Sequence, residues 1–294
     1  MITQEVKQLI IDRLKERESI EGSRQNVCRK YDLRPDILSR MLNGETDKVL
    51  SVQRWLRLAR RFDIPLNNEV KIETAQTPTF KHIWAQLEFA QEHSVSGMLC
   101  DRADIGKTHT ATLYARQGKN VVYIDCAQCK SSQAFIRALA KGFGLEHTGS
   151  LRMVRDDLFD YVKTVDKPLV ILDEFGDLSL GAYMEFKAFW NATDHYCGFY
   201  AMGANGLRRK IENNISKNII GFEEIFSRLG NKFQRITPQD TYSFKKFQDK
   251  QMIQIAKANG IDNIQEMLAR SNGSLRRISI QKGIEKKNDK TNNN

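Results

Sequence analysis

The sequence predicts an α/β fold in which a parallel sheet is flanked by helices, with a small all-α region before it and another after it. Four short apolar runs, which end near Cys100, Asp125, Asp173 and Gly203, alternate with longer stretches of helical periodicity. Such alternation is typical of parallel sheets, because parallel strands need long, usually helical crossovers. The chain of 294 residues is long enough for a sizeable core and two or three domains.

A short polar turn between the first apolar run and a helical stretch closes on Gly106-Lys107-Thr108. Strand, loop and helix in this order form the context of a phosphate-binding loop, in which backbone N–H groups converge on phosphate oxygens. The lysine of such a loop reaches the β- and γ-phosphates, and the hydroxyl after it ligates Mg²⁺. We therefore expect ATP and Mg²⁺ here, bound by Asp104, Ile105, Gly106, Lys107, Thr108 and His109, with Thr108 on the metal.

Two acidic residues depart from the usual form of this loop. Asp101 stands where the motif has its first glycine, and Asp104 stands where many such loops also have glycine. A side chain with a Cβ adopts positive φ less freely than glycine, and carboxylates beside a triphosphate are unfavourable. We expect these departures to affect the rate of ATP hydrolysis more than ATP binding.

A second apolar run, Lys167–Glu174, ends in two acids, Asp173 and Glu174. This is the pattern of the Walker B strand, in which the aspartate supports the metal and the glutamate polarises the attacking water. It follows the phosphate loop at the expected distance and in the expected order. Together the two motifs predict an ATPase with Asp173 at the metal and Glu174 as general base.

The charge distribution predicts a polyanionic partner. The chain has a net charge of +10, with +4 on residues 1–66, +9 on residues 207–294 and −3 between them. Basic segments on both sides of a nucleotide-binding core favour nucleic acid, although a soluble basic protein would show the same total. No apolar run approaches the length of a membrane span, so no membrane partner is expected. Five scattered cysteines indicate a reducing compartment such as the cytoplasm, and the Cys126-x-x-Cys129 pair is expected to pack in the core.

Residues 27–44 fit a helix-turn-helix that resembles the phage-repressor type. Val27 and Cys28 supply the apolar side of a first helix, and Pro35 begins a second helix that ends in Ser-Arg-Met-Leu-Asn-Gly. Asp32 occupies a turn position that is often glycine, and aspartate tolerates the left-handed conformation. The outward side of the second helix predicts DNA contacts from Arg34, Ser39 and Arg40. A small helical adaptor that binds protein is the alternative.

Three further residues resemble functional positions of the AAA+ ATPase superfamily. Asn205 follows the fourth apolar run, as sensor 1 does, and Arg228 closes an Ile-Phe-Ser-Arg segment similar to the arginine-finger motif. Arg276 lies in an Asn-Gly-Ser-Leu-Arg-Arg segment that resembles sensor 2 on a helical lid. The resemblance implies catalytic roles for these three residues and for Glu174. It also implies a DNA contact at Lys130 and Ser131, in the loop after the second strand.

The order of the motifs over nearly the whole chain resembles the phage Mu transposition protein B group of AAA+ ATPases. The resemblance implies an AAA+ P-loop core with a repressor-like helix-turn-helix domain and a helical lid. It implies a protein that binds double-stranded DNA without sequence specificity when ATP is bound and polymerises with itself on that DNA. Such a protein delivers the DNA to a DDE-type transposase, stimulates transposition, and hydrolyses ATP slowly. The expected parts are a DNA-binding domain at 1–66, a linker at 67–78, the ATPase core at 79–238, the lid at 239–283 and a basic disordered tail at 284–294.

Two other functions stay open from the sequence. One is a helicase loader of the same superfamily, whose partner would be a replicative helicase. The other is a repressor-like regulator with a degenerate ATPase module, which would bind a defined operator.

Overall fold

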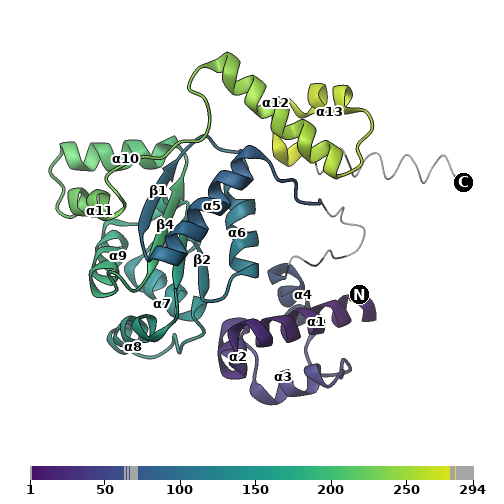
Figure 1. Ribbon diagram of the computed structural model, residues 1–294. Coiled ribbons are helices and arrows are strands. Elements are labelled where there is room, and N and C mark those ends of the chain that lie inside the picture. The colour runs from purple at the N-terminus through teal and green to yellow at the C-terminus, as the bar shows by residue number, and fades with distance from the viewer. Residues whose placement is uncertain (1, 63, 65, 67–71, 279–281, 283–294) are drawn as a thin grey trace, which may run out of the picture.

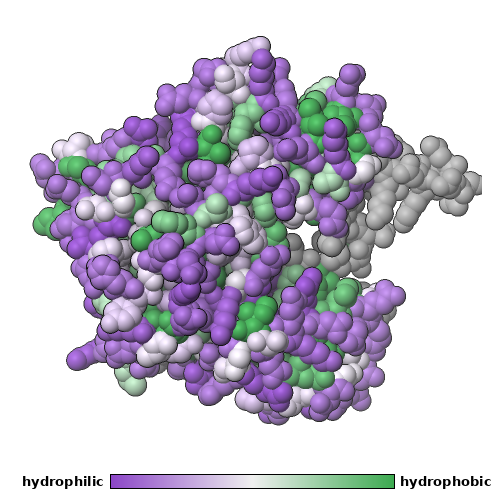
Figure 2. All heavy atoms as spheres, viewed as in Figure 1, coloured by the Kyte–Doolittle hydropathy of each residue, from purple (hydrophilic) through white to green (hydrophobic). Residues whose placement is uncertain are grey.

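A computed structural model describes residues 2–62, 64, 66, 72–278 and 282. Its helices and strands form a helical N-terminal domain, a central α/β domain and a C-terminal pair of helices, for which we use the name lid (Figure 1). Hydrophilic side chains cover most of the face shown in Figure 2. No helix within the described ranges is long and apolar enough to cross a membrane.

The central sheet contains four parallel strands in the order β1-β4-β3-β2. Their bounds are Ser96–Cys100 for β1, Val121–Asp125 for β2, Leu169–Asp173 for β3 and Gly198–Gly203 for β4. The register pairs Cys100 with Gly203 and Asp125 with Asp173, so the carboxyl ends of the strands meet at one edge. Ligands of open parallel sheets bind at this edge. The predicted parallel sheet is confirmed.

Helices cover both faces of the sheet (Figure 1). On one face, α5 (Pro78–His93) and α6 (Lys107–Gln117) pack through Ile83, Leu87 and Ala111 against Leu99, Ile171 and Tyr200. The opposite face packs on a larger core with many aromatic rings, including Phe175, Phe186 and Phe199. The helices on that side are α7 (Ser132–Gly142), α8 (Leu151–Thr164), α9 (Leu180–Ala192), α10 (Asn205–Ser216) and α11 (Phe222–Arg228).

The segment after α11 runs beside the outer edge of β1. Gln234 donates its backbone N–H to the Met98 carbonyl at 2.9 Å and accepts from the Cys100 N–H at 3.0 Å. These bonds satisfy edge groups of the strand that would otherwise be unpaired. The segment continues through residues 235–240, which we call the connector, into the lid.

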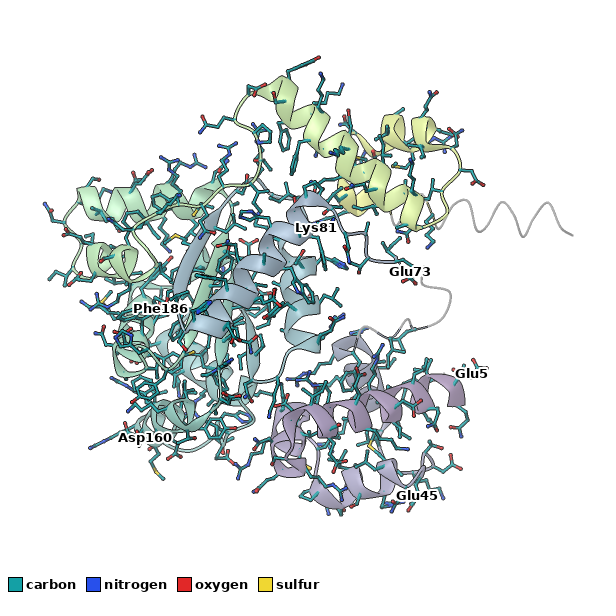
Figure 3. All side chains as sticks on the ribbon, in the orientation of Figure 1. Glu5, Glu45, Glu73, Lys81, Asp160 and Phe186 are labelled. Atoms are coloured by element: carbon teal, nitrogen blue, oxygen red, sulfur yellow. The ribbon has the colours of Figure 1, made fainter. Side chains whose placement is uncertain are left out.

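The lid consists of α12 (Thr241–Ala258) and α13 (Ile264–Ser271), which pack on a small core around Met252, Ile261 and Met267. Asn259, just after α12, makes two hydrogen bonds with the backbone of Glu73. Its Oδ1 accepts from the Glu73 N–H at 2.7 Å and its Nδ2 donates to the Glu73 carbonyl at 3.0 Å. The lid is thereby fixed to the segment that precedes α5 (Figure 3). The basic tail expected at residues 284–294 lies outside the described residues.

The N-terminal domain contains α1 (Gln4–Glu21), α2 (Arg24–Tyr31), α3 (Pro35–Leu42) and α4 (Val52–Arg61) around a core that includes Ile10, Leu38 and Trp55. Asp32 adopts φ 57° at the turn between α2 and α3, and Pro35 is the first residue of α3, both as expected. Two cross-domain bonds join this domain to the α/β domain: Arg17 donates to the Arg116 carbonyl and Asn26 to the Tyr161 hydroxyl.

Residues 67–71 of the linker expected at 67–78 lie outside the described residues, and its last residue, Pro78, is the first residue of α5. Helix α5 begins at Pro78, because the Thr77 side chain accepts a hydrogen bond from the Phe80 N–H and proline is favourable at the first helical position.

Candidate nucleotide-binding site

A cavity of about 430 Å³ lies at the carboxyl edge of the sheet. Three parts of the chain enclose it: the loop before α6, the segment before α5, and the lid. The volume is within the range of pockets that bind small molecules and cofactors. Its lining includes residues 72–75 and 103–110, together with Thr77, Phe80, Glu174, Ala204, Ile255, Leu275 and Arg276.

The loop before α6 has the shape of a phosphate-binding loop. Gly106 has φ 99°, which favours glycine, and Lys107 is the first residue of α6. Ile105 is buried and anchors the loop to the protein. The N-terminus of α6 therefore lies at the cavity. Its first N–H groups and the positive end of the helix dipole both favour a bound anion.

Lys107 is held inside this loop by backbone carbonyls. Its Nζ donates to the carbonyl of Arg102 at 2.6 Å and to that of Asp101 at 3.2 Å. Burial lowers the pKa of Lys107, while the Asp101, Asp173 and Glu174 carboxylates act in the opposite direction. The ammonium group thus lies at the loop and is bonded only to uncharged oxygens.

Thr108 and Asp173, 65 residues apart in sequence, are in direct contact. The Thr108 hydroxyl donates to Asp173 Oδ2 at 2.6 Å, and the other carboxylate oxygen accepts from the Glu174 N–H at 3.0 Å. A hydroxyl and a carboxylate are oxygen ligands of the kind that Mg²⁺ prefers. These residues therefore fit a magnesium ion, which when bound to ATP neutralises phosphate charge.

Tyr123 is a member of this cluster that the sequence analysis missed. Its hydroxyl donates to Asp173 Oδ2 at 3.0 Å from the neighbouring strand β2. Burial and the adjacent Asp173 carboxylate raise the pKa of Tyr123, so the phenol stays a donor. Strand adjacency provides the contact, and no motif in the sequence marks it.

Glu174 begins the turn after β3 with φ 48° and lines the cavity. Partial burial, and to a lesser degree the Asp173 carboxylate, raises the pKa of Glu174 above its ordinary value. Lys210 stabilises the turn, because its Nζ donates to the carbonyls of Gly176 at 2.7 Å and Leu178 at 2.8 Å. A carboxylate at this place, with a raised pKa, suits a general base for water.

The Asp101 side chain makes its hydrogen bonds mainly with the connector. Its buried carboxylate accepts from the backbone N–H groups of Ile236 at 2.7 Å and Thr237 at 2.8 Å, and also from the Thr237 hydroxyl. The Arg102 N–H adds a further bond at 2.7 Å. These donors hold the Asp101 side chain on the connector, and its carboxylate still acts on the charge of Lys107.

Asp104 connects the same loop to the lid. It has φ 58°, accepts a hydrogen bond from the Ser274 hydroxyl at 2.6 Å, and lies 3.8 Å from Arg276 Nε. Asp104 and Arg276 both line the cavity. Arg276, the expected sensor 2 residue, therefore lies near the phosphate loop, and its role stays a prediction.

Two other predicted catalytic residues lie outside the cavity lining. Asn205 is the exposed first residue of α10, next to Ala204, which does line the cavity. Arg228 on α11 donates to Asn191 Oδ1 at 2.6 Å and lies over the Trp190 ring at 5.2 Å. Within a single chain, Asn205 and Arg228 therefore do not line the cavity that Lys107 lines.

The predicted DNA contacts already have partners within the protein. Arg34 pairs with Asp36, Arg40 pairs with Glu45, and the Ser39 hydroxyl accepts from Arg24 at 3.4 Å. Glu45 lies on the side of the N-terminal domain that is distant from the α/β domain (Figure 3).

The predicted DNA-contacting loop in the α/β domain lies beside the turn after β3. Lys130 pairs with Asp177 at 3.0 Å, and the Ser131 side chain caps α7 by accepting from the Ala134 N–H.

The segment before α5 contributes contacts that the sequence analysis missed. Thr74 Oγ1 lies 2.9 Å from His109 Nε2, and Glu73 is bonded to Asn259 of the lid. This stretch has no periodicity or motif that would mark it as part of a site.

The cysteines do not form a metal site. Cys126 and Cys129 are buried in the larger core, as expected. Over the described part of the chain, no group of three or more histidine, cysteine, aspartate or glutamate side chains is placed to hold a metal ion.

The parallel sheet, the loop with Lys107 and Thr108, and the strand end with Asp173 and Glu174 define a P-loop nucleotide-binding protein. Residues 91–211 match the family described as AAA domain, so a domain of this kind is present in the chain. An AAA domain indicates nucleotide binding, usually with Mg²⁺, and a nucleotide-hydrolysing P-loop ATPase. No curated protein matches the sequence.

Proposed function

We propose that this protein is an ATP-controlled DNA-binding protein that polymerises on double-stranded DNA and delivers it to a DDE-type transposase. The observation that carries the ATP-dependent part is the single cavity lined by Lys107, Thr108, Glu174 and Arg276. The cavity borders the α/β domain, the lid and the segment before α5, so a ligand there contacts all three. A nucleotide at this position would change how the parts are held together.

The roles within the cavity follow from the contacts. Lys107 and the N-terminus of α6 would bind phosphate oxygens, and Thr108 with Asp173 would hold Mg²⁺. Glu174 would accept the proton of the attacking water, and Arg276 would bring the lid onto the phosphates. Arg228 would act on the nucleotide of a neighbouring subunit, which requires release of its bond to Asn191.

The charges outside the cavity support a DNA partner. Residues 1–66 and 207–294 carry net charges of +4 and +9. The short helices α2 and α3, joined by a turn at Asp32, support the proposal of a helix-turn-helix. The transposase as recipient rests on the resemblance of the motif order to the phage Mu transposition protein B group.

Electron microscopy of the protein on random-sequence duplex, with and without ATP, tests the proposal. Polymers should form only with ATP. The Glu174→Gln variant should form longer-lived polymers, and Lys107→Ala should form none. Binding confined to one operator sequence would favour a regulator, and a complex with a replicative helicase in place of a transposase would favour a loader. Either result would contradict the proposed function.

A further inference from the structure

Helix α4 presents an arginine-rich side to solvent. Its ten residues, VQRWLRLARR, include four arginines and no acidic residue. At 3.6 residues per turn, Arg54, Arg57 and Arg60 project from about one third of the helix circumference. All three side chains are exposed, while Trp55 and Leu58 on the other side are buried in the core of the N-terminal domain. We call Arg54, Arg57 and Arg60 the α4 arginine face.

The α4 arginine face has no ion-pair partner among the described residues. The fourth arginine, Arg61, differs because it lies over the Tyr31 ring at 4.9 Å. Arg34 and Arg40, the arginines expected to contact DNA, are each paired with a carboxylate. Arginines without a carboxylate partner among the described residues keep their capacity to bind phosphate, and α4 places three of them on one exposed side of a helix that has no acidic residue.

We propose that the α4 arginine face binds the phosphate backbone of duplex DNA. The inference rests on the proposed DNA-binding function and assigns its phosphate contacts to a helix outside the predicted helix-turn-helix. Arg54 and Arg60 are about 9 Å apart along the axis, given a rise of 1.5 Å per residue. Roughly five phosphates lie along the same length of B-DNA, so each guanidinium has a phosphate within reach. Such contacts position a protein on a duplex without reading its sequence.

The packing of α4 favours DNA over an anionic membrane surface. A helix that binds membranes needs an apolar side to insert below the headgroups. In α4 the large apolar side chains Trp55 and Leu58 are 2% and 4% exposed, because they form part of the domain core. Val52 in the first turn of α4 is 59% exposed. A single valine is much less apolar surface than an inserting helix needs, so the helix offers a partner mainly charge, as suits a polyanion in water.

Salt-dependent binding of the full-length protein to a random-sequence duplex, with ATP, tests this proposal. The variant R54Q/R57Q/R60Q removes the face, and R13Q/R152Q/R155Q removes three arginines that are paired with acids and lie outside the predicted helix-turn-helix contacts. The two variants have the same net charge. Removal of three phosphate contacts should reduce the slope of log K against log salt by about 2.7. The affinity ratio between 50 and 200 mM salt should then shrink about 40-fold relative to the parent. The paired-arginine variant should keep most of the parental slope.

A charge-conserving variant, R54K/R57K/R60K, should retain the parental slope and so separates loss of charge from loss of folding. The assignment to α4 is wrong if R54Q/R57Q/R60Q keeps the parental slope, and DNA binding itself would still stand. A parent protein that binds no duplex at any salt concentration would overturn both this assignment and the proposed function. Face-dependent binding to phosphatidylserine vesicles with unchanged duplex binding would overturn the assignment in favour of a membrane.

Discussion

Asp101 accepts hydrogen bonds from both the backbone N–H and the hydroxyl of Thr237, although 136 residues separate them. One residue begins the phosphate loop, and the other lies in the connector that leads to the lid. The Ile236 N–H donates to the same carboxylate, so four donors, including that of Arg102, satisfy its two oxygens. The position where the motif has glycine therefore fastens the phosphate loop to the connector.

Replacement of Asp101 should destabilise the protein and weaken ATP binding. In Asp101→Asn the amide NH₂ replaces an acceptor and meets N–H donors, which leaves buried groups unpaired at a cost of about 1–3 kcal/mol each. Asp101→Gly restores the common motif but removes the hydrogen bonds from the Asp101 side chain to the connector. Thermal unfolding and the KM for ATP measure both effects, with Thr237→Ser as the control that keeps the hydroxyl. An Asp101→Gly variant as stable as the parent would contradict this role.

Loss of the Tyr123 hydroxyl should slow ATP hydrolysis and leave metal-free nucleotide binding unchanged. Tyr123→Phe removes one of two donors that orient Asp173 Oδ2, and the remaining donor, Thr108, is itself expected on the metal. We expect kcat to fall several-fold, with a stability loss of about 1 kcal/mol. Tyr114→Phe is a matched control. It removes a hydroxyl that donates to Gln91 Oε1 at 2.8 Å and has no bond to Asp173. Equal effects of the two variants on kcat would show that Tyr123 has no special role.

Three variants should separate binding, hydrolysis and the contribution of a neighbour. Glu174→Gln should bind ATP without hydrolysing it, because the amide cannot accept the proton of water. Lys107→Ala should lose ATP binding, since it removes a charge-assisted contact to phosphate. Arg228→Ala should keep ATP binding but lose the hydrolysis that needs a second subunit. Turnover and equilibrium binding measure all three, and parental turnover by Glu174→Gln would refute its assignment as the base.

The pH dependence of hydrolysis should show the raised pKa of Glu174. Partial burial and the Asp173 carboxylate favour the protonated acid, so activity should fall on acidification at a pH above the ordinary glutamate value of 4.5. The same shift affects stability in a defined direction. A folded carboxyl with a raised pKa binds more protons than the unfolded one, so its contribution to stability decreases as the pH rises through that interval. Profiles of kcat/KM and of thermal unfolding against pH measure these effects in the parent, and Glu174→Gln should remove the effect on thermal unfolding.

The sequence predicted the parts of the site that lie at the ends of strands. Lys107, Thr108, Asp173 and Glu174 follow apolar runs, and parallel strands bring such ends to one edge, so their proximity could be inferred from local patterns. The left-handed conformation of Asp32 could also be predicted from local sequence, because it depends on the residue type at a turn. The helix-turn-helix identity, the DNA contacts and the finger at Arg228 stay predictions.

The contacts that the sequence did not reveal depend on which elements are neighbours in space. Tyr123 reaches Asp173 because β2 lies beside β3. Asp101 reaches Thr237 because the segment that leads into the connector runs beside β1 in space. Neither arrangement has a signature in the spacing of residues. The bond between Glu73 and Asn259 likewise crosses 186 positions and joins segments without a motif.

The bond from Arg17 to the Arg116 carbonyl has a geometric consequence for assembly. Arg116 lies in the last turn of α6, and a guanidinium there is favoured by the negative end of the helix dipole. With the Asn26–Tyr161 bond, this contact sets the angle between the N-terminal domain and the phosphate loop. Every subunit of a polymer would then carry its α4 arginines at the same angle and height. Bound DNA would have to follow the helical pitch of the protein, and would be over- or underwound wherever that pitch differs from its own.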